Sequence, residues 1–119
     1  MAKNDYYVIV YKILTYLYEC MKAGKRPEAE DFNWNCEMFS IPQSYWTEIM
    51  KELSANGYVK GIVEVSALGG ESGVKVSHDV AITMKGVEFL QDNNMMAKAK
   101  EFLGKGIENV ILSIIGRII

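Results

Sequence analysis

Few side chains in this sequence are of the kinds that catalyse reactions or bind metals. His78 is the only histidine, and the strand alternation around it predicts an inward position beside Val76 and Val80. A lone histidine in such a position is usually a hydrogen-bonded core residue, and nothing stands at metal-ligand spacing from it. Cys20 and Cys36 are sixteen residues apart, which predicts two reduced thiols packed as small hydrophobic residues. We therefore expect no metal site and no cofactor.

Two further segments resemble functional motifs but lack the residues that those motifs need. The loop 69–73 has glycine at three of its five positions, but no Lys-Ser or Lys-Thr pair follows, and it joins two predicted strands. The acidic run of Glu28, Glu30 and Asp31 is typical of a solvated edge. Because no nucleophile stands beside a base, the sequence predicts a protein that acts by binding and not an enzyme.

The residues best suited to contact a partner lie in a predicted helix at about 42–56 and in the hairpin that follows it. Glutamine can pair with adenine in the major groove, while hydroxyl groups and lysines contact phosphates. The candidate nucleic-acid-binding residues are Gln43, Ser44, Thr47, Lys51 and Lys75. Glu48 and Glu52 share the helix face, and Glu71 lies in the loop; all three would repel phosphate. Two alternatives stay open, contact with duplex DNA or a solvated face on a fold kept for another role.

Composition and charge narrow the class of protein. The chain has 119 residues, half of them hydrophobic, with 13 basic and 15 acidic side chains and a net charge of −2. These values are typical of one globular domain and count mildly against strong nucleic-acid binding. Residues 1–27 carry a basic excess, which would add to a DNA interface if a dimer placed Lys3, Lys22, Lys25 and Arg26 beside the duplex. The chain shows neither a signal peptide nor a membrane-length apolar run, so we expect a cytoplasmic protein.

Hydrophobic periodicity and capping residues define the elements that must position these side chains. Asp5 and Gly24 are suited to begin and end a first helix, whose nearly continuous apolar surface predicts burial on two sides. Pro42 suits the first turn of a helix, and Thr83 is a good N-cap after the hairpin. The predicted order is a helix at 5–23, one short helix or two turns within 25–40, a helix at 42–56, strands at 58–65 and 74–82, a helix at 84–93 and a final helix from 95.

A helix-turn-helix followed directly by a β-hairpin is the winged-helix arrangement, with helix 42–56 as the recognition helix and Leu68–Gly73 as the wing tip. The segment Thr83-x-Lys85-Gly86-x-x-x-Leu90 after the hairpin resembles many winged-helix proteins. Two further motifs accompany it, Asn56-Gly57-Tyr58 and Asn93-Asn94-Met95-Met96. With these motifs, residues 5–103 resemble the YjcQ family. The resemblance implies a small winged-helix protein of the kind found in Gram-positive bacteria, their phages and mobile elements, and it carries no catalytic motif.

Residues 104–119 lie outside the resemblance, and Ile107–Ile119 is strongly apolar, with eight aliphatic side chains in thirteen positions. Such a helix has more apolar surface than one core needs, and pairing with the first helix across a two-fold axis would bury both. Packing within the monomer is the alternative. Docking on a membrane is disfavoured, because the polar side of Asn109, Ser113 and Arg117 is poor in basic residues. The candidate packing or dimer residues are Ile107, Val110, Ile111, Ile114, Ile115 and Ile118.

Together these observations predict an α+β protein, with a winged-helix domain over residues 1–94 and a C-terminal helix over 95–119. We expect a homodimer that has neither a small-molecule substrate nor a cofactor. The first hypothesis for its function is a DNA-binding transcriptional regulator of phage or mobile-element type. The alternative is a protein–protein interaction or assembly module without DNA contacts. A continuous positive strip on helix 42–56 would favour DNA, and a neutral or negative strip would favour the alternative.

Overall fold

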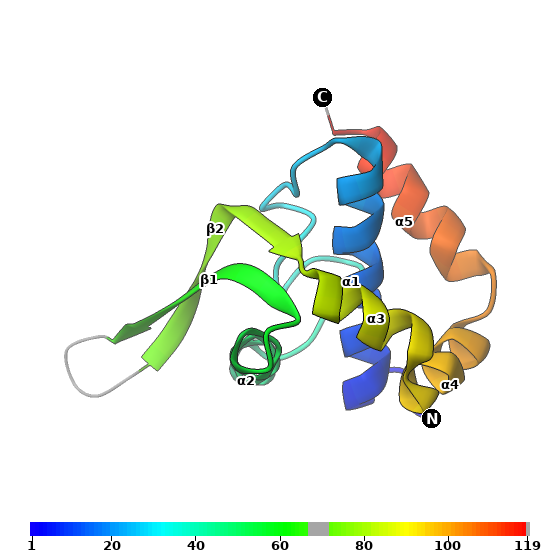
Figure 1. Cartoon of the computed structure of the whole chain (residues 1–119), viewed down its shortest axis with the longest axis horizontal. Helices are drawn as coiled ribbons and strands as arrows, with labels where there is room; N and C mark the ends of the chain where they lie inside the picture. Colours follow the sequence, from blue (N-terminus) through cyan, green and yellow to red (C-terminus); the bar gives the residue numbers. More distant parts are fainter. Residues whose placement is uncertain (67–71, 119) are drawn as a thin grey trace.

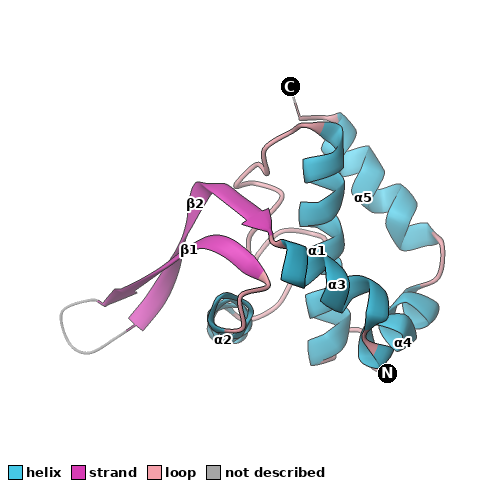
Figure 2. Ribbon diagram, viewed as in Figure 1, coloured by secondary structure: helices cyan, strands magenta, loops and turns pink. Residues whose placement is uncertain are grey.

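The structure of this chain is a computed structural model that describes residues 1–66 and 72–118. Within these ranges it contains five helices and one two-stranded antiparallel sheet, which confirms the α+β class (Figures 1 and 2). The elements in chain order are α1 (Tyr6–Ala23), α2 (Gln43–Ala55), β1 (Val59–Ser66), β2 (Ser72–Ile82), α3 (Met84–Asp92), α4 (Asn94–Leu103) and α5 (Gly106–Gly116). The predicted wing tip falls largely on residues 67–71, which lie outside the described residues.

Helix α1 forms the centre of the molecule. It contacts β2, α3, α4 and α5, and Figure 1 shows it between the hairpin and α5. The Asp5 carboxylate accepts a hydrogen bond of 3.1 Å from the backbone N–H of Tyr7, and Gly24 ends the helix with a φ of +70°. Every residue from Val8 to Leu17 is buried. The prediction of a helix covered on more than one side is therefore confirmed.

Residues 25–40 form turns and bends, which corresponds to the second of the two predicted forms. Aromatic contacts hold this segment in place. Phe32 stacks on Tyr16 of α1 with 5.4 Å between ring centroids, and it meets Trp46 of α2 at 5.2 Å. Phe39 lies 5.0 Å from the same Trp46 ring. The segment therefore joins α2 to α1 through side-chain packing.

The base of the hairpin contains a large irregularity. Between Lys60 and Ile62 the ladder skips residues 77–80 of β2, which bulge out opposite the single residue Gly61. Gly61 has a φ of +87°, and a Cβ atom there would lie 2.6 Å from the Cα of Val80. Only glycine fits this position, because a side chain would meet both an unfavourable backbone conformation and a neighbouring strand.

The bulge overturns the predicted position of His78. The sequence pattern predicts an inward side chain beside Val76 and Val80, whereas His78 is exposed in the structure. The reason is that the bulged residues leave the alternation of the strand, so the period of two no longer assigns a face. Among the residues that the structure describes, no three His, Cys, Asp or Glu side chains are placed to share a metal ion.

The prediction of one final helix is also wrong. The chain turns at Gly104, which has a φ of +71°, and this turn separates α4 from α5. The side-chain oxygen of Asn93 caps α4 by accepting a 2.8 Å hydrogen bond from the N–H of Met95. Both helices pack against α1 of the same chain, so residues 94–118 share the core of the preceding residues. None of the helices in the described ranges is long and apolar enough to cross a bilayer.

Candidate nucleic-acid interface

Helix α2 carries four of the five predicted nucleic-acid-binding residues. Gln43 and Ser44 are exposed at its N-terminal end, while Thr47 is half-buried. The Lys51 side chain is only 23% exposed, and its Nζ lies 3.9 Å from a carboxylate oxygen of Glu48. The structure therefore places polar groups on one helix, but the lysine among them lies against the protein and faces a carboxylate.

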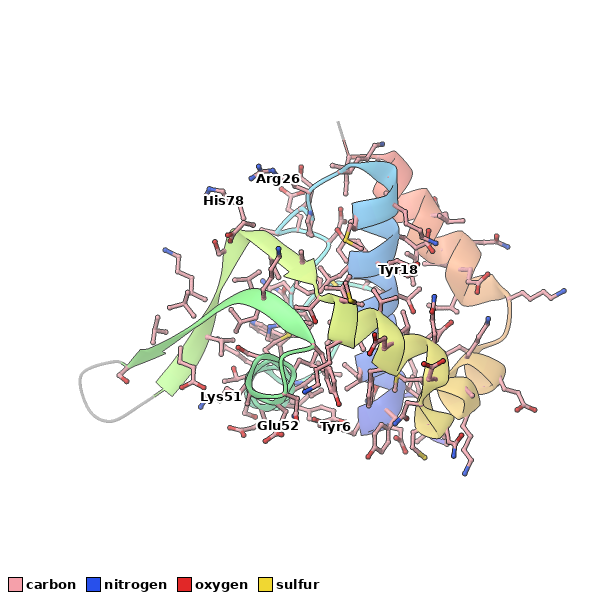
Figure 3. The ribbon with its side chains drawn as sticks, viewed as in Figure 1. Tyr6, Tyr18, Arg26, Lys51, Glu52 and His78 are labelled. Atoms are coloured by element: carbon pink, nitrogen blue, oxygen red, sulfur yellow. The ribbon has the colours of Figure 1, made fainter. Side chains whose placement is uncertain are left out.

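Acidic side chains dominate the charge of this helix face. Glu48 is 71% exposed, and Glu52 is also exposed, so two carboxylates accompany the single ammonium group of Lys51. Figure 3 shows Lys51 and Glu52 both projecting from α2 on the side below the hairpin. A duplex that approached α2 would meet a local charge of about −1, and phosphate contact requires the opposite sign.

The fifth predicted residue, Lys75, lies on another surface. It pairs with Val63 across the hairpin, and alternation places both on the sheet face opposite Val74 and Val76, which pack against the core. Val63 is 51% exposed, and Val65 on the same face is 43% exposed. The structure therefore does not bring Lys75 together with the residues of α2, and the outer face of the hairpin is largely apolar.

A group of basic residues that the sequence pattern did not bring together lies at the base of the hairpin. Lys25, Arg26, Lys60 and His78 line a cavity of about 240 Å³, and Asp79 lines it as well. Figure 3 shows Arg26 and His78 next to each other at this edge. The sequence signal for this group was Gly61, because a glycine inside a predicted strand can mark a bulge.

A local hydrogen bond and nearby side chains lower the pKa of the Asp79 carboxyl. The Ser77 hydroxyl donates to Asp79, and this hydrogen bond lowers the pKa of the Asp79 carboxyl. The nearby His78 and Lys60 side chains lower the pKa of Asp79 by a smaller amount. Lys25 also donates a 3.3 Å hydrogen bond to the carbonyl of Ile115, and so fixes the end of α5 to the same corner.

The six predicted packing or dimer residues of the C-terminal segment divide into three groups. Ile111, Ile115 and Ile118 are buried within the single chain. Ile107 and Ile114 are half-buried against the same core. Val110 is 48% exposed. Packing within the monomer, the alternative considered from the sequence, therefore accounts for most of this apolar surface.

These observations define a small α+β protein with a helical body, a projecting hairpin and separate acidic, basic and apolar surfaces. The family model described as YjcQ protein matches residues 11–108, which is most of the chain. The chain therefore belongs to the YjcQ family, as the motifs in its sequence indicated. No curated protein and no solved structure matches it.

Proposed function

We propose that this protein is a cytoplasmic protein–protein interaction module of winged-helix architecture, which acts by binding and not by catalysis. The element order supports the architecture, because the β1–β2 hairpin follows α2 directly. The chain departs from that arrangement in residues 25–40, where turns stand in place of a second helix. In a helix-turn-helix, the helix that precedes the recognition helix positions it. The replacement of that helix by turns is therefore consistent with a protein that does not bind DNA through α2.

The observation that carries this proposal is the charge of the exposed α2 face. Glu48 and Glu52 outnumber Lys51, and Lys51 lies close to Glu48. Non-specific DNA affinity comes mainly from cations that replace the counterions of phosphate groups. A recognition helix with a negative exposed face lacks that contribution.

A mobility-shift experiment with mixed duplex DNA at low salt tests this proposal. We expect the full chain to leave the DNA unshifted. The matched variant Glu48→Gln/Glu52→Gln removes the two carboxylates, and we expect it to gain weak binding that disappears as salt is raised. A shift by the unmodified chain that weakens steeply with salt and is lost in Lys51→Gln would overturn the proposal.

The first protein partner to test is a second copy of this chain. The outer hairpin face carries the exposed side chains of Val63 and Val65 near Lys75, and apolar side chains that remain exposed are the kind that interfaces bury. We expect light scattering to give a dimer mass for the full chain and a monomer mass for Val63→Lys/Val65→Lys. A monomer mass for the unmodified chain would exclude the homodimer.

A second candidate function rests on the basic cavity at the base of the hairpin. Duplex DNA could be bound there by Arg26, Lys60 and His78, which would make the protein a transcriptional regulator of phage or mobile-element type. In that case the mobility shift would be present, and Arg26→Gln/Lys60→Gln would abolish it. The matched variant Lys51→Gln would leave the shift unchanged, which separates this candidate from DNA recognition by α2.

A further inference from the structure

A groove of about 800 Å³ runs between α5 and the segment that contains Cys36 and Met38. The residues that line this groove belong neither to the DNA-binding candidates nor to the exposed hairpin face. Its volume lies within the range of about 300–1,000 Å³ that is typical of small-molecule sites. Lys12 of α1 also lines the groove, and this residue distinguishes the groove from an ordinary surface depression.

Lys12 is a buried cation with incomplete partners. Lys12 is only 6% exposed, and its Nζ donates a 3.0 Å hydrogen bond to the carbonyl of Met38. An ammonium group has three donors, and within the described part of the chain the structure gives this one no carboxylate within 4.0 Å. Burial lowers the pKa of Lys12, and the positive charge of Lys3 lowers it further. The ammonium group therefore has the Met38 carbonyl as a hydrogen-bond partner, and an anion in the groove would supply acceptors for its other donors together with a counterion.

The α5 wall of the groove has a matching chemical pattern. Asn109, Ser113 and Arg117, which form the narrow polar side of this helix, are spaced four residues apart and all line the groove. The aliphatic residues that accompany them along the same wall are Ile107, Val110 and Ile114. The groove therefore offers hydrogen-bond donors and a second cation beside a continuous aliphatic surface.

The opposite rim limits the charge that a ligand can carry. Glu30, Asp31 and Glu37 line the groove there. With Lys12 and Arg117 these carboxylates give the lining a charge of about −1, so they repel phosphates and other multiply charged anions. A single negative charge is favourable only directly beside Lys12 and Arg117, away from this rim.

We propose that this groove binds a monocarboxylate with an aliphatic chain, whose carboxylate contacts the Lys12 ammonium and whose chain lies along Ile107, Val110 and Ile114. This site is independent of the proposed protein-binding role, because the hairpin face and α2 contribute none of its lining residues. The carboxylate supplies acceptors for the remaining donors of Lys12, and the aliphatic chain buries apolar surface of α5.

Titration of the full chain with decanoate, below the concentration at which it forms micelles, tests this inference. Cys36 lines the groove and is half-buried, while Cys20 is buried in the core, so alkylation by iodoacetamide reports on the groove. We expect decanoate to slow alkylation of Cys36 at least fivefold and to shift the amide NMR signals of Asn109 and Ser113. Decanol and inorganic phosphate at the same concentration should do neither, because one lacks the charge and the other lacks the chain.

Two variants test the role of the cations. Lys12→Met keeps an unbranched side chain of similar shape without the ammonium group, and we expect it to weaken decanoate binding at least tenfold. Arg117→Gln changes an exposed residue and should weaken binding about threefold in a folded protein, which keeps the test valid if Lys12→Met fails to fold. Equal binding of decanoate and decanol to the unmodified chain, or unchanged binding in the folded variants, would overturn the inference.

Discussion

The conformation of Gly61 determines the shape of the hairpin base. The residue has a φ of +87°, and an added Cβ would lie 2.6 Å from the Cα of Val80. We expect Gly61→Ala to lower the free energy of unfolding by about 3 kcal/mol, because left-handed strain and backbone overlap act together. Gly24→Ala is the matched control, since Gly24 also has a positive φ but open space around it, and its loss should be about 1 kcal/mol. Equal losses in urea denaturation would contradict this assignment.

The buried thiol of Cys20 is expected to lower the free energy of unfolding as the pH becomes alkaline. Burial raises the pKa of Cys20 from an ordinary value of 9.0 to about 11. As the pH rises from 9 to 11, the unfolded chain therefore loses a proton that the folded chain keeps, and the free energy of unfolding falls. Urea midpoints measured at pH 8, 9 and 10 should fall less steeply for Cys20→Ala than for the unmodified chain. Cys36→Ala serves as the control for removing a thiol that lies outside the core.

The accuracy of sequence-based prediction at this scale depended on whether a signal was local. The capping roles of Asp5 and Thr83 could be predicted, because a cap is set by residues two or three positions away. The exposure of His78 could not, because it depends on a bulge that spans both strands. The burial of Lys12 could not be predicted either, because a lysine within an apolar helix indicates an exposed position. In the structure its ammonium group bonds to the carbonyl of Met38, in the segment that packs over it.

At the scale of elements, the start of α3 is tied to the end of α2. The Thr83 hydroxyl accepts a 3.0 Å hydrogen bond from the N–H of Gly86 and donates a 2.6 Å hydrogen bond to the carbonyl of Gly57. We expect Thr83→Ala to lower the free energy of unfolding by about 1–2 kcal/mol, because the cap and the connection are lost together. Thr83→Ser keeps the hydroxyl and should lose less than half as much. A similar loss in both variants would show that the methyl group, not the hydroxyl, stabilises this junction.

The boundaries of the elements show where periodicity fails as a guide. The first helix, the α2 helix and the hairpin strands were predicted within about two residues, because each carries its own caps or alternation. The C-terminal segment was predicted as one helix, since apolar residues continue on both sides of Gly104. What separates α4 from α5 is the positive φ of that glycine, a backbone conformation that lets the chain reverse onto α1. Periodicity reports which residues are buried, but it does not report where a helix bends back.

At the scale of the whole molecule, the interaction surfaces are spread over separate regions. The hairpin projects from the helical body on the side away from α5 (Figure 1). Its exposed valines, Val63 and Val65, are not among the residues that line the groove beside α5. The acidic face of α2 and the basic cavity at the base of the hairpin are likewise formed by different residues. Variants of one surface can therefore be made without removing side chains from another, and their effects on binding should be close to additive.

The packing of α5 within its own chain gives a prediction for the whole molecule. Ile111 is fully buried, whereas its neighbour Leu112 is 52% exposed. We expect Ile111→Ala to lower the free energy of unfolding by about 3 kcal/mol, since it leaves a cavity between α5 and the core, and Leu112→Ala to change it by less than about 0.5 kcal/mol. Because the contact is intramolecular, the loss caused by Ile111→Ala should be the same at low and high protein concentration. A loss that grows with concentration would show instead that Ile111 packs across a dimer, because stability supplied by a partner subunit follows mass action.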